Sequence, residues 1–141
     1  MRLLDVNVVL AAHRDDHPHF RSARAWLDQM LVARAPFSVT DLVAGSFLRL
    51  ATNRRVFSLP TPLAEAFAYL RALRQQPGHV LLGPGAAHLE IFERICDQSD
   101  ARGDLVADAQ LAAIAIEHAC ELVSFDRDFA RFDELRWTRP A

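Results

Sequence analysis

Four aspartates in this chain occupy positions expected of a catalytic metal site. Asp5 directly follows a short apolar run at the amino terminus, and Asp126 ends the segment ELVSFD. Asp108 lies in the apolar segment GDLVADAQLAAIAI, four residues after Asp104, so in a helix these two carboxylates share one face. Unit charges about 4 Å apart repel by roughly 4 kcal/mol at an effective dielectric near 20, so a cluster of them needs a cation. Carboxylate oxygens favour Mg²⁺, for which Mn²⁺ can substitute.

A structural interpretation of each polar residue stands beside the catalytic one. Asp104 follows Gly103 and could simply cap a helix. Asp5 is harder to explain in this way, because a lone carboxylate at a buried strand end is costly without a partner. Asn7, two residues later, could orient the Asp5 carboxylate or merely turn the chain.

Short apolar strands and longer amphipathic helices alternate along the chain and must position these acids. We expect strands at residues 2–5, 36–40, 79–83 and 121–126, and helices at residues 16–35, 41–57, 62–76, 86–102 and 103–120. Residues 127–141 allow a short helix and an edge strand. Thr40 or Asp41 can cap the helix that begins near them.

This alternation predicts an α/β fold. Strands separated by helices pair in parallel through right-handed crossovers, which gives a three-layer α/β/α domain with a mainly parallel sheet of four or five strands. We expect a single domain over residues 1–141. In such sheets the functional site lies at the carboxyl ends of the strands, where Asp5 and Asp126 are placed.

Composition excludes several other classes of protein. The 141 residues include no Lys, so neither a phosphate-binding P-loop nor the Lys-assisted chemistry of Asp-nucleophile phosphatases and phosphoacceptor domains can occur. A net charge of −2 argues against binding nucleic acid by bulk positive charge and leaves only a local patch. The six His residues are scattered and propose no zinc site.

The expected location is the cytoplasm. No apolar run is long enough to span a membrane, and Asp5 interrupts the apolar stretch that a signal peptide would need. Cys96 and Cys120 are far apart in the sequence and are expected to be reduced core residues.

Three segments together resemble the acidic motifs of VapC-type PIN domains, the toxin ribonucleases of type II toxin–antitoxin systems. They are LLDVNVVLAAH, GDLVADAQLAAIA and ELVSFDRDFARF, in the order and spacing of that family. The segments FLRLATNRRVF and LRW are also similar to one VapC subgroup, so the resemblance covers essentially the whole chain.

The resemblance implies a magnesium-dependent endoribonuclease with a flap-nuclease-like fold, commonly a homodimer and inhibited by a VapB-like antitoxin. Its metal-binding acids correspond to Asp5, Asp108 and Asp126, and Asn7 and Asp128 fall in supporting positions. The expected mechanism is attack of a metal-activated water on RNA, which leaves a 3′-hydroxyl and a 5′-phosphate.

One position departs from the family pattern. Many PIN domains have a Glu in the helix after the second strand, in a pattern like AEFLR, whereas this chain reads AGSFLR with Ser46 there. Asp41 or Asp104 could supply the missing ligand. The alternative is a weakened PIN fold that only binds RNA or its antitoxin.

Four arginines are candidate phosphate contacts, although a solvated surface role is the alternative for each. They are Arg49, Arg54, Arg55 and Arg102.

Overall fold

A four-stranded, all-parallel sheet forms the centre of the molecule. The computed structural model describes residues 1–141. Its strands are β1 (Arg2–Leu4), β2 (Phe37–Ser38), β3 (Glu121–Val123) and β4 (Trp137–Thr138), in the spatial order β2-β1-β3-β4. All their carboxyl ends therefore meet at one edge.

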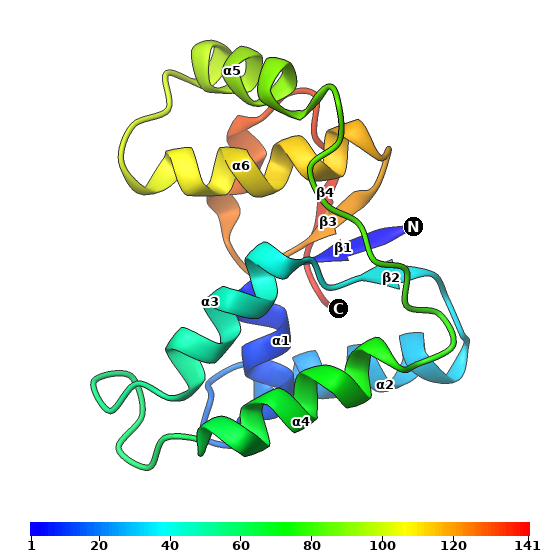
Figure 1. Ribbon diagram of the computed structural model, residues 1–141, viewed down its shortest axis with the longest axis vertical. Helices are drawn as coiled ribbons and strands as arrows, with labels where there is room; N and C mark the ends of the chain where they lie inside the picture. The colour runs from blue at the N-terminus through cyan, green and yellow to red at the C-terminus, as the bar shows by residue number, and fades with distance from the viewer.

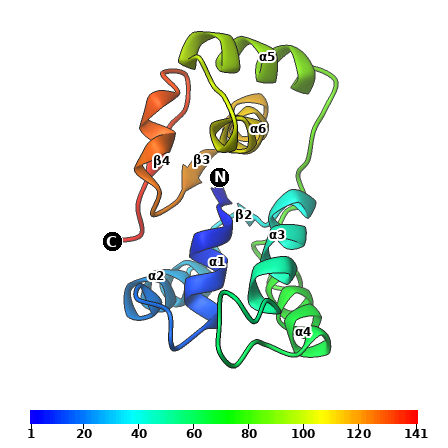
Figure 2. The same cartoon turned by 90° about the vertical axis from the view of Figure 1, so that its left-hand side faces the viewer.

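Helices cover both faces of this sheet and confirm the predicted three-layer α/β/α fold. Figure 1 shows α5 and α6 on one side of the sheet and α1 to α4 on the other, and Figure 2 shows the same layers from the side. The helices are α1 (Val6–His13), α2 (Phe20–Val32), α3 (Asp41–Ala51), α4 (Leu63–Arg74), α5 (His88–Ser99) and α6 (Asp104–Glu117), followed by the 3₁₀ helix η1 (Arg127–Arg131). No helix is both long and apolar enough to cross a membrane.

Helix α6 is the most deeply buried helix of its layer, as its sequence predicts. The five residues Leu111–Ala115 are all buried, and three of them are alanines. Small side chains allow this helix to pack closely between the sheet and α5. Its amino-terminal turns, which carry Asp104 and Asp108, are thereby held in a fixed position over the sheet edge.

Helix α1 was not predicted. Its residues Val8–Ala12 are all buried, so the segment has no polar face and shows no amphipathic period. Asp5 begins the helix as its N-cap, with the Val6 N–H donating to Oδ1 at 2.7 Å. The first catalytic candidate is therefore held at a junction between a strand and a helix.

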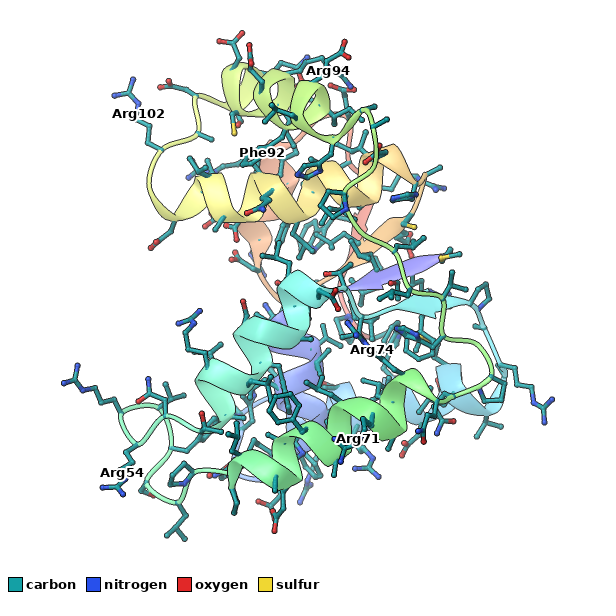
Figure 3. The ribbon with its side chains drawn as sticks, in the orientation of Figure 1. Arg54, Arg71, Arg74, Phe92, Arg94 and Arg102 are labelled. Atoms are coloured by element: carbon teal, nitrogen blue, oxygen red, sulfur yellow. The ribbon has the colours of Figure 1, made fainter.

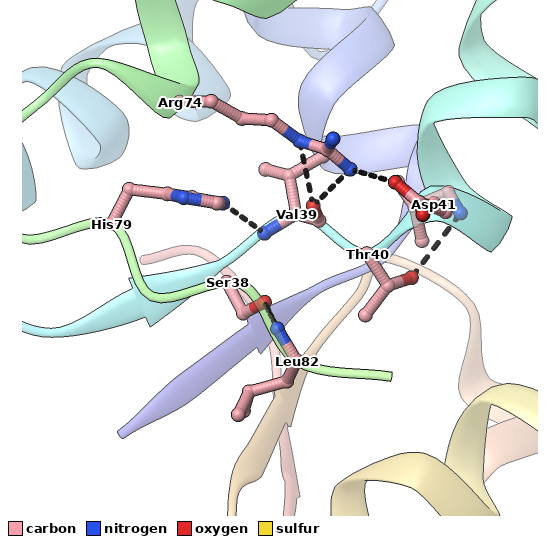
Figure 4. Close-up of polar contacts among 8 residues, drawn as sticks. Ser38, Val39, Thr40, Asp41, Arg74, His79 and Leu82 are labelled. Atoms are coloured by element: carbon pink, nitrogen blue, oxygen red, sulfur yellow. Dashed lines mark hydrogen bonds and ion pairs between the residues drawn. The ribbon is translucent and has the colours of Figure 1, made fainter. Parts of the chain in front are cut away.

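The strand predicted at residues 79–83 does not form, which corrects the sequence prediction. Phe37 and His79 make a single isolated bridge, and Val80 and Leu81 are exposed. Beyond the bridge, side chains accept the hydrogen bonds of backbone N–H groups in the two segments. His79 Nε2 accepts from the Val39 N–H at 3.0 Å, and Ser38 Oγ accepts from the Leu82 N–H at 3.2 Å (Figure 4). Side-chain bonds thus replace the regular ladder along the free edge of β2.

Helix α3 begins as predicted but ends six residues early, at Ala51 instead of residue 57. Thr40, not Asp41, is its N-cap, and its Oγ1 accepts from the Val43 N–H at 3.3 Å. The loop that follows is held by Arg14, which donates to Thr61 Oγ1 at 3.1 Å and lies 4.1 Å from the centre of the Phe57 ring. The connection between α3 and α4 is therefore an anchored loop.

Candidate active site

Asp5 and Asp126 lie at neighbouring strand ends, as the parallel topology requires. Asp5 follows β1 and is only 9% exposed. One of its carboxylate oxygens accepts from the Val6 N–H, and the other accepts from Ser124 Oγ at 2.6 Å. Burial raises the pKa of Asp5, while these two hydrogen bonds oppose that shift because they stabilise the charged form.

Ser124 is a site residue that the sequence reasoning missed. It is fully buried at the end of β3, and its Oγ also accepts from Asn7 Nδ2 at 3.0 Å and from the Asp126 N–H at 3.0 Å. Asn7 Oδ1 in turn accepts from the Phe125 N–H at 3.2 Å. A hydroxyl within the apolar run of ELVSFD was the available signal. Asn7 and Ser124 together tie the end of β1 to the end of β3.

Three carboxylates come together beside this network. Single oxygens of Asp108, Asp126 and Asp128 lie within 4.8 Å of one another. The Asp128 N–H donates to Asp126 Oδ1 at 2.9 Å, which brings these two acids close together at the start of η1. Asp128, expected only in a supporting position, thus belongs to the cluster itself, while Asp5 lies at its buried side.

The electrostatics of this cluster favour a cation. Burial, and then the charges of Asp126, Asp5, Asp128 and Asp104, raise the pKa of Asp108 to about 6. A divalent metal would offset both effects, and an all-oxygen donor set suits Mg²⁺ or Mn²⁺. The residues present therefore fit a hard divalent cation.

A cleft of about 240 Å³ opens beside the acids, between α3 and α6. It is lined by Asp5, Asp104 and Asp108 together with Ser46 and Arg49 from α3. A larger cavity, of about 690 Å³, lies around the turn between α1 and α2 and the loop before α4, and none of the clustered acids line it. The smaller cleft is the candidate site because Asp5, Asp104 and Asp108 line it and Asp108 belongs to the carboxylate cluster.

Of the two acids that could replace the missing Glu, only one lies at the cleft. Asp104 reaches the cleft, and the capping interpretation is wrong for it, since Gly103 is the N-cap of α6 and no side chain caps the helix. Asp41 is instead paired with Arg74 Nη2 at 2.8 Å and does not line the cleft (Figure 4). Arg74 also donates to the Val39 carbonyl oxygen, so the guanidinium that pairs with Asp41 is fixed beside the start of α3.

The four candidate arginines are distributed unevenly around the cleft. Arg49 lines it directly. Arg54 and Arg55 are exposed in the loop after α3, and Arg102 is exposed before α6, 3.3 Å from Asp100. Arg54 and Arg102 project from the same side of the molecule in Figure 3, one from each of the two layers of helices.

Comparison with known proteins identifies the family to which the chain belongs. A model of the PIN domain matches residues 2–135. The chain is 56% identical over 140 residues to ribonuclease VapC31 of Mycobacterium tuberculosis, covering 99% of both proteins. The chain belongs to the VapC ribonucleases of the PIN-domain family.

Solved structures of VapC proteins share the fold. VapBC2 from Rickettsia felis, bound to a DNA fragment from its promoter, matches with a TM-score of 0.71 at 15% identity, over 98% of this chain and 97% of the other. Mycobacterium tuberculosis VapC20, a sarcin–ricin loop-cleaving toxin, matches with a TM-score of 0.67 at 18% identity, over 96% of this chain and 99% of the other. Both confirm the PIN architecture.

Proposed function

We propose that this VapC-family PIN domain is the toxin of a toxin–antitoxin pair and cleaves RNA with Mg²⁺ held by Asp5, Asp108 and Asp126. The observation that carries the proposal is the cluster of Asp108, Asp126 and Asp128 beside Asp5, where burial and the charges of the neighbouring acids raise the pKa of Asp108 to about 6. Of the three clustered acids, only Asp128 has an ion-pair partner, Arg131 at 3.6 Å, so the cluster keeps an excess of negative charge that a metal would offset. Mn²⁺ is expected to substitute.

The chain's own groups have separate roles in this mechanism. Asp108 lines the cleft and lies in the carboxylate cluster with Asp126, while Asp5 is held in one orientation by Ser124 and Val6. Asp5, Asp108 and Asp126 would hold Mg²⁺, which would supply Lewis acidity for the scissile phosphate and for an attacking water. Arg49 lies in the same cleft and is placed to contact a phosphate of the substrate.

The ends of the RNA products test this mechanism. Attack by water on the phosphorus atom leaves a 5′-phosphate and a 3′-hydroxyl, whereas attack by the ribose 2′-hydroxyl leaves a cyclic phosphate. We expect products that a 5′-phosphate-dependent exonuclease degrades and poly(A) polymerase extends. Products that resist both enzymes would exclude the proposed reaction, even if RNA were cleaved.

A PIN fold that binds without cutting is the second candidate, and Ser46 is the observation that favours it. Ser46 lines the cleft where the family pattern has a Glu, so α3 contributes no carboxylate there. A purified protein that binds RNA but leaves it intact in Mg²⁺ would support this candidate over the nuclease.

Ser46→Glu is expected to lower the Mg²⁺ concentration required for half-maximal cleavage roughly severalfold, because affinity for hard cations follows the charge of the ligands. Asp104→Asn is expected to raise it, since Asp104 lines the same cleft and its charge acts on Asp108. Metal titrations of cleavage measure both shifts. Asp97→Asn is the matched control, because Asp97 is exposed on α5 and does not line the cleft. An unchanged requirement in both variants would contradict this account of the fourth position.

The partners follow from the same site. RNA is the proposed substrate, and a VapB-like antitoxin is the proposed inhibitor, presenting an Arg or Lys to the carboxylates in place of metal. The structural relatives that include VapB support this pairing. The homodimer and the cytoplasmic location remain predictions.

A further inference from the structure

An aromatic cluster lies at the same sheet edge as the acids. The rings of His19 and Phe125 stack in parallel, with centroids 4.3 Å apart and planes 9° apart. The guanidinium carbon of Arg139 lies 5.8 Å from the centre of the Phe125 ring, and the ring of His17 lies 5.9 Å from that of His19. Four residues from three distant parts of the chain thus form one cluster around this stacked pair.

The backbone connects this cluster directly to the acid cluster. Phe125 stands between Ser124 and Asp126, and its N–H donates to Asn7 Oδ1. Arg139 directly follows β4, which pairs in parallel with β3. Figure 2 shows the carboxyl-terminal segment ending near α2, the helix whose N-cap residue is His19. Along this edge the side chains therefore change from carboxylates at β1 and β3 to aromatic rings and a cation at β3 and β4.

These groups are available to a ligand. His19 and Arg139 are exposed, and Arg139 forms no ion pair with any acid of the chain. Phe125 stacks on one face of the His19 ring, and His19 as a whole remains exposed. The His19 backbone N–H donates to His17 Nδ1 at 3.1 Å, which fixes the backbone that carries the ring. An exposed ring beside an unpaired guanidinium is suited to a base and its phosphate.

We propose that this cluster is a nucleobase subsite: a base of the RNA near the cleaved phosphate stacks on His19, and Arg139 contacts a neighbouring phosphate. The proposal rests on the proposed function, because it takes RNA as the substrate. A purely structural stack, which only holds the start of α2 against the end of β3, is the alternative. The two differ in whether the bases of the ligand matter.

The test compares two ligands with the full-length protein. One is a fluorescently labelled oligoadenylate of about a dozen nucleotides, and the other is an abasic ribose-phosphate chain of equal length, so that they differ only in the bases. Binding is measured by fluorescence anisotropy with Ca²⁺ in place of Mg²⁺, and a gel checks that the oligomer stays intact. The wild type is expected to prefer the oligoadenylate about tenfold, as one stacked base would give.

His19→Ala is expected to remove this preference and leave the affinity for the abasic chain unchanged, and His19→Tyr is expected to retain it. Arg139→Gln is expected to lower the affinity for both oligomers equally, because both contain phosphates. Phe67→Ala and Arg71→Gln, both exposed on α4, are the matched aromatic and cationic controls and should change neither affinity.

Two results would overturn the subsite. One is a preference for the oligoadenylate that is equal in the wild type and in His19→Ala. The other is an equal loss of affinity for both oligomers in His19→Ala, which would indicate a structural role. A wild type that bound neither oligomer would overturn both the subsite and RNA as the substrate. Failure of the proposed function alone is seen separately, when the wild type binds RNA with the expected base preference but does not cleave it in Mg²⁺. In the latter case the subsite stands and the nuclease does not.

Discussion

Asp108→Asn is expected to reduce RNA cleavage at least about a hundredfold while the protein remains folded, because the change removes one charged ligand from a metal cluster. Asp108 is the cleanest acid to test. It lies among Asp126, Asp128 and Asp5, is only partly buried, and caps no helix. The measurement is the cleavage rate at saturating Mg²⁺.

The same change should stabilise the metal-free protein at neutral pH. The pKa of Asp108 is about 6 in the folded chain against an ordinary value of 3.8, so the stability that its protonated form contributes is present below about pH 4. That stability is lost as the pH rises through 6. We expect Asp108→Asn to raise the melting temperature at pH 7.5 by about 3–5 °C for each kcal/mol of repulsion removed, and to have little effect at pH 4.

Two variants make this result specific. Asp97→Asn removes an exposed charge on α5, and should alter neither cleavage nor stability appreciably. Asp5→Asn should also abolish cleavage but lower stability, because Asp5 is buried and accepts from two donors that an amide matches less well. Cleavage at the normal rate by Asp108→Asn would show that the site has been misassigned.

Removing divalent metal with EDTA is expected to decrease cleavage at least about a thousandfold, since a metal of this kind supplies several kcal/mol of transition-state stabilisation. Mg²⁺ or Mn²⁺ should restore it, because the clustered ligand atoms are all carboxylate oxygens. The measurement is the rate of cleavage of a structured RNA after dialysis and addition of each metal.

Thermal unfolding gives a readout of metal binding that does not depend on activity. Mg²⁺ should raise the melting temperature of the wild type, because a ligand of the folded state stabilises it, and should raise that of Asp108→Asn much less. Activity that required Zn²⁺, or that persisted in EDTA, would contradict the proposed metal site. A uniform effect of Mg²⁺ on both proteins would indicate binding elsewhere.

Much of the candidate site could be proposed from single residues and their spacing. Asp5, Asp108 and Asp126 stand out because carboxylates within or after apolar segments need partners, and because parallel strands end at a common edge. The three-layer fold followed from the alternation of strand and helix patterns, and the structure confirms it. Both features depend on the types and spacing of nearby residues, which can be read from the sequence.

Other elements could not be predicted because their environment decides them. Helix α1 is buried on every side and therefore lacks the amphipathic period by which surface helices are recognised. Residues 79–83 have the apolar pattern of a strand, but the side chains of Ser38 and His79 take up the bonds that a ladder would use. In both cases packing with distant segments outweighs the local pattern.

The sequence by itself determined which acids are candidates for metal chemistry, in which order they occur, and that Asp5 and Asp126 follow parallel strands whereas Asp104 and Asp108 lie in a helix. Only the tertiary structure decided how they meet. It brought Ser124 to Asp5 across 119 positions of the chain, drew Asp128 into the cluster, and paired Asp41 with Arg74 while Asp104 entered the cleft. The physical reason is that a residue's type fixes which contacts it can make, whereas its partner depends on which distant segments pack beside it.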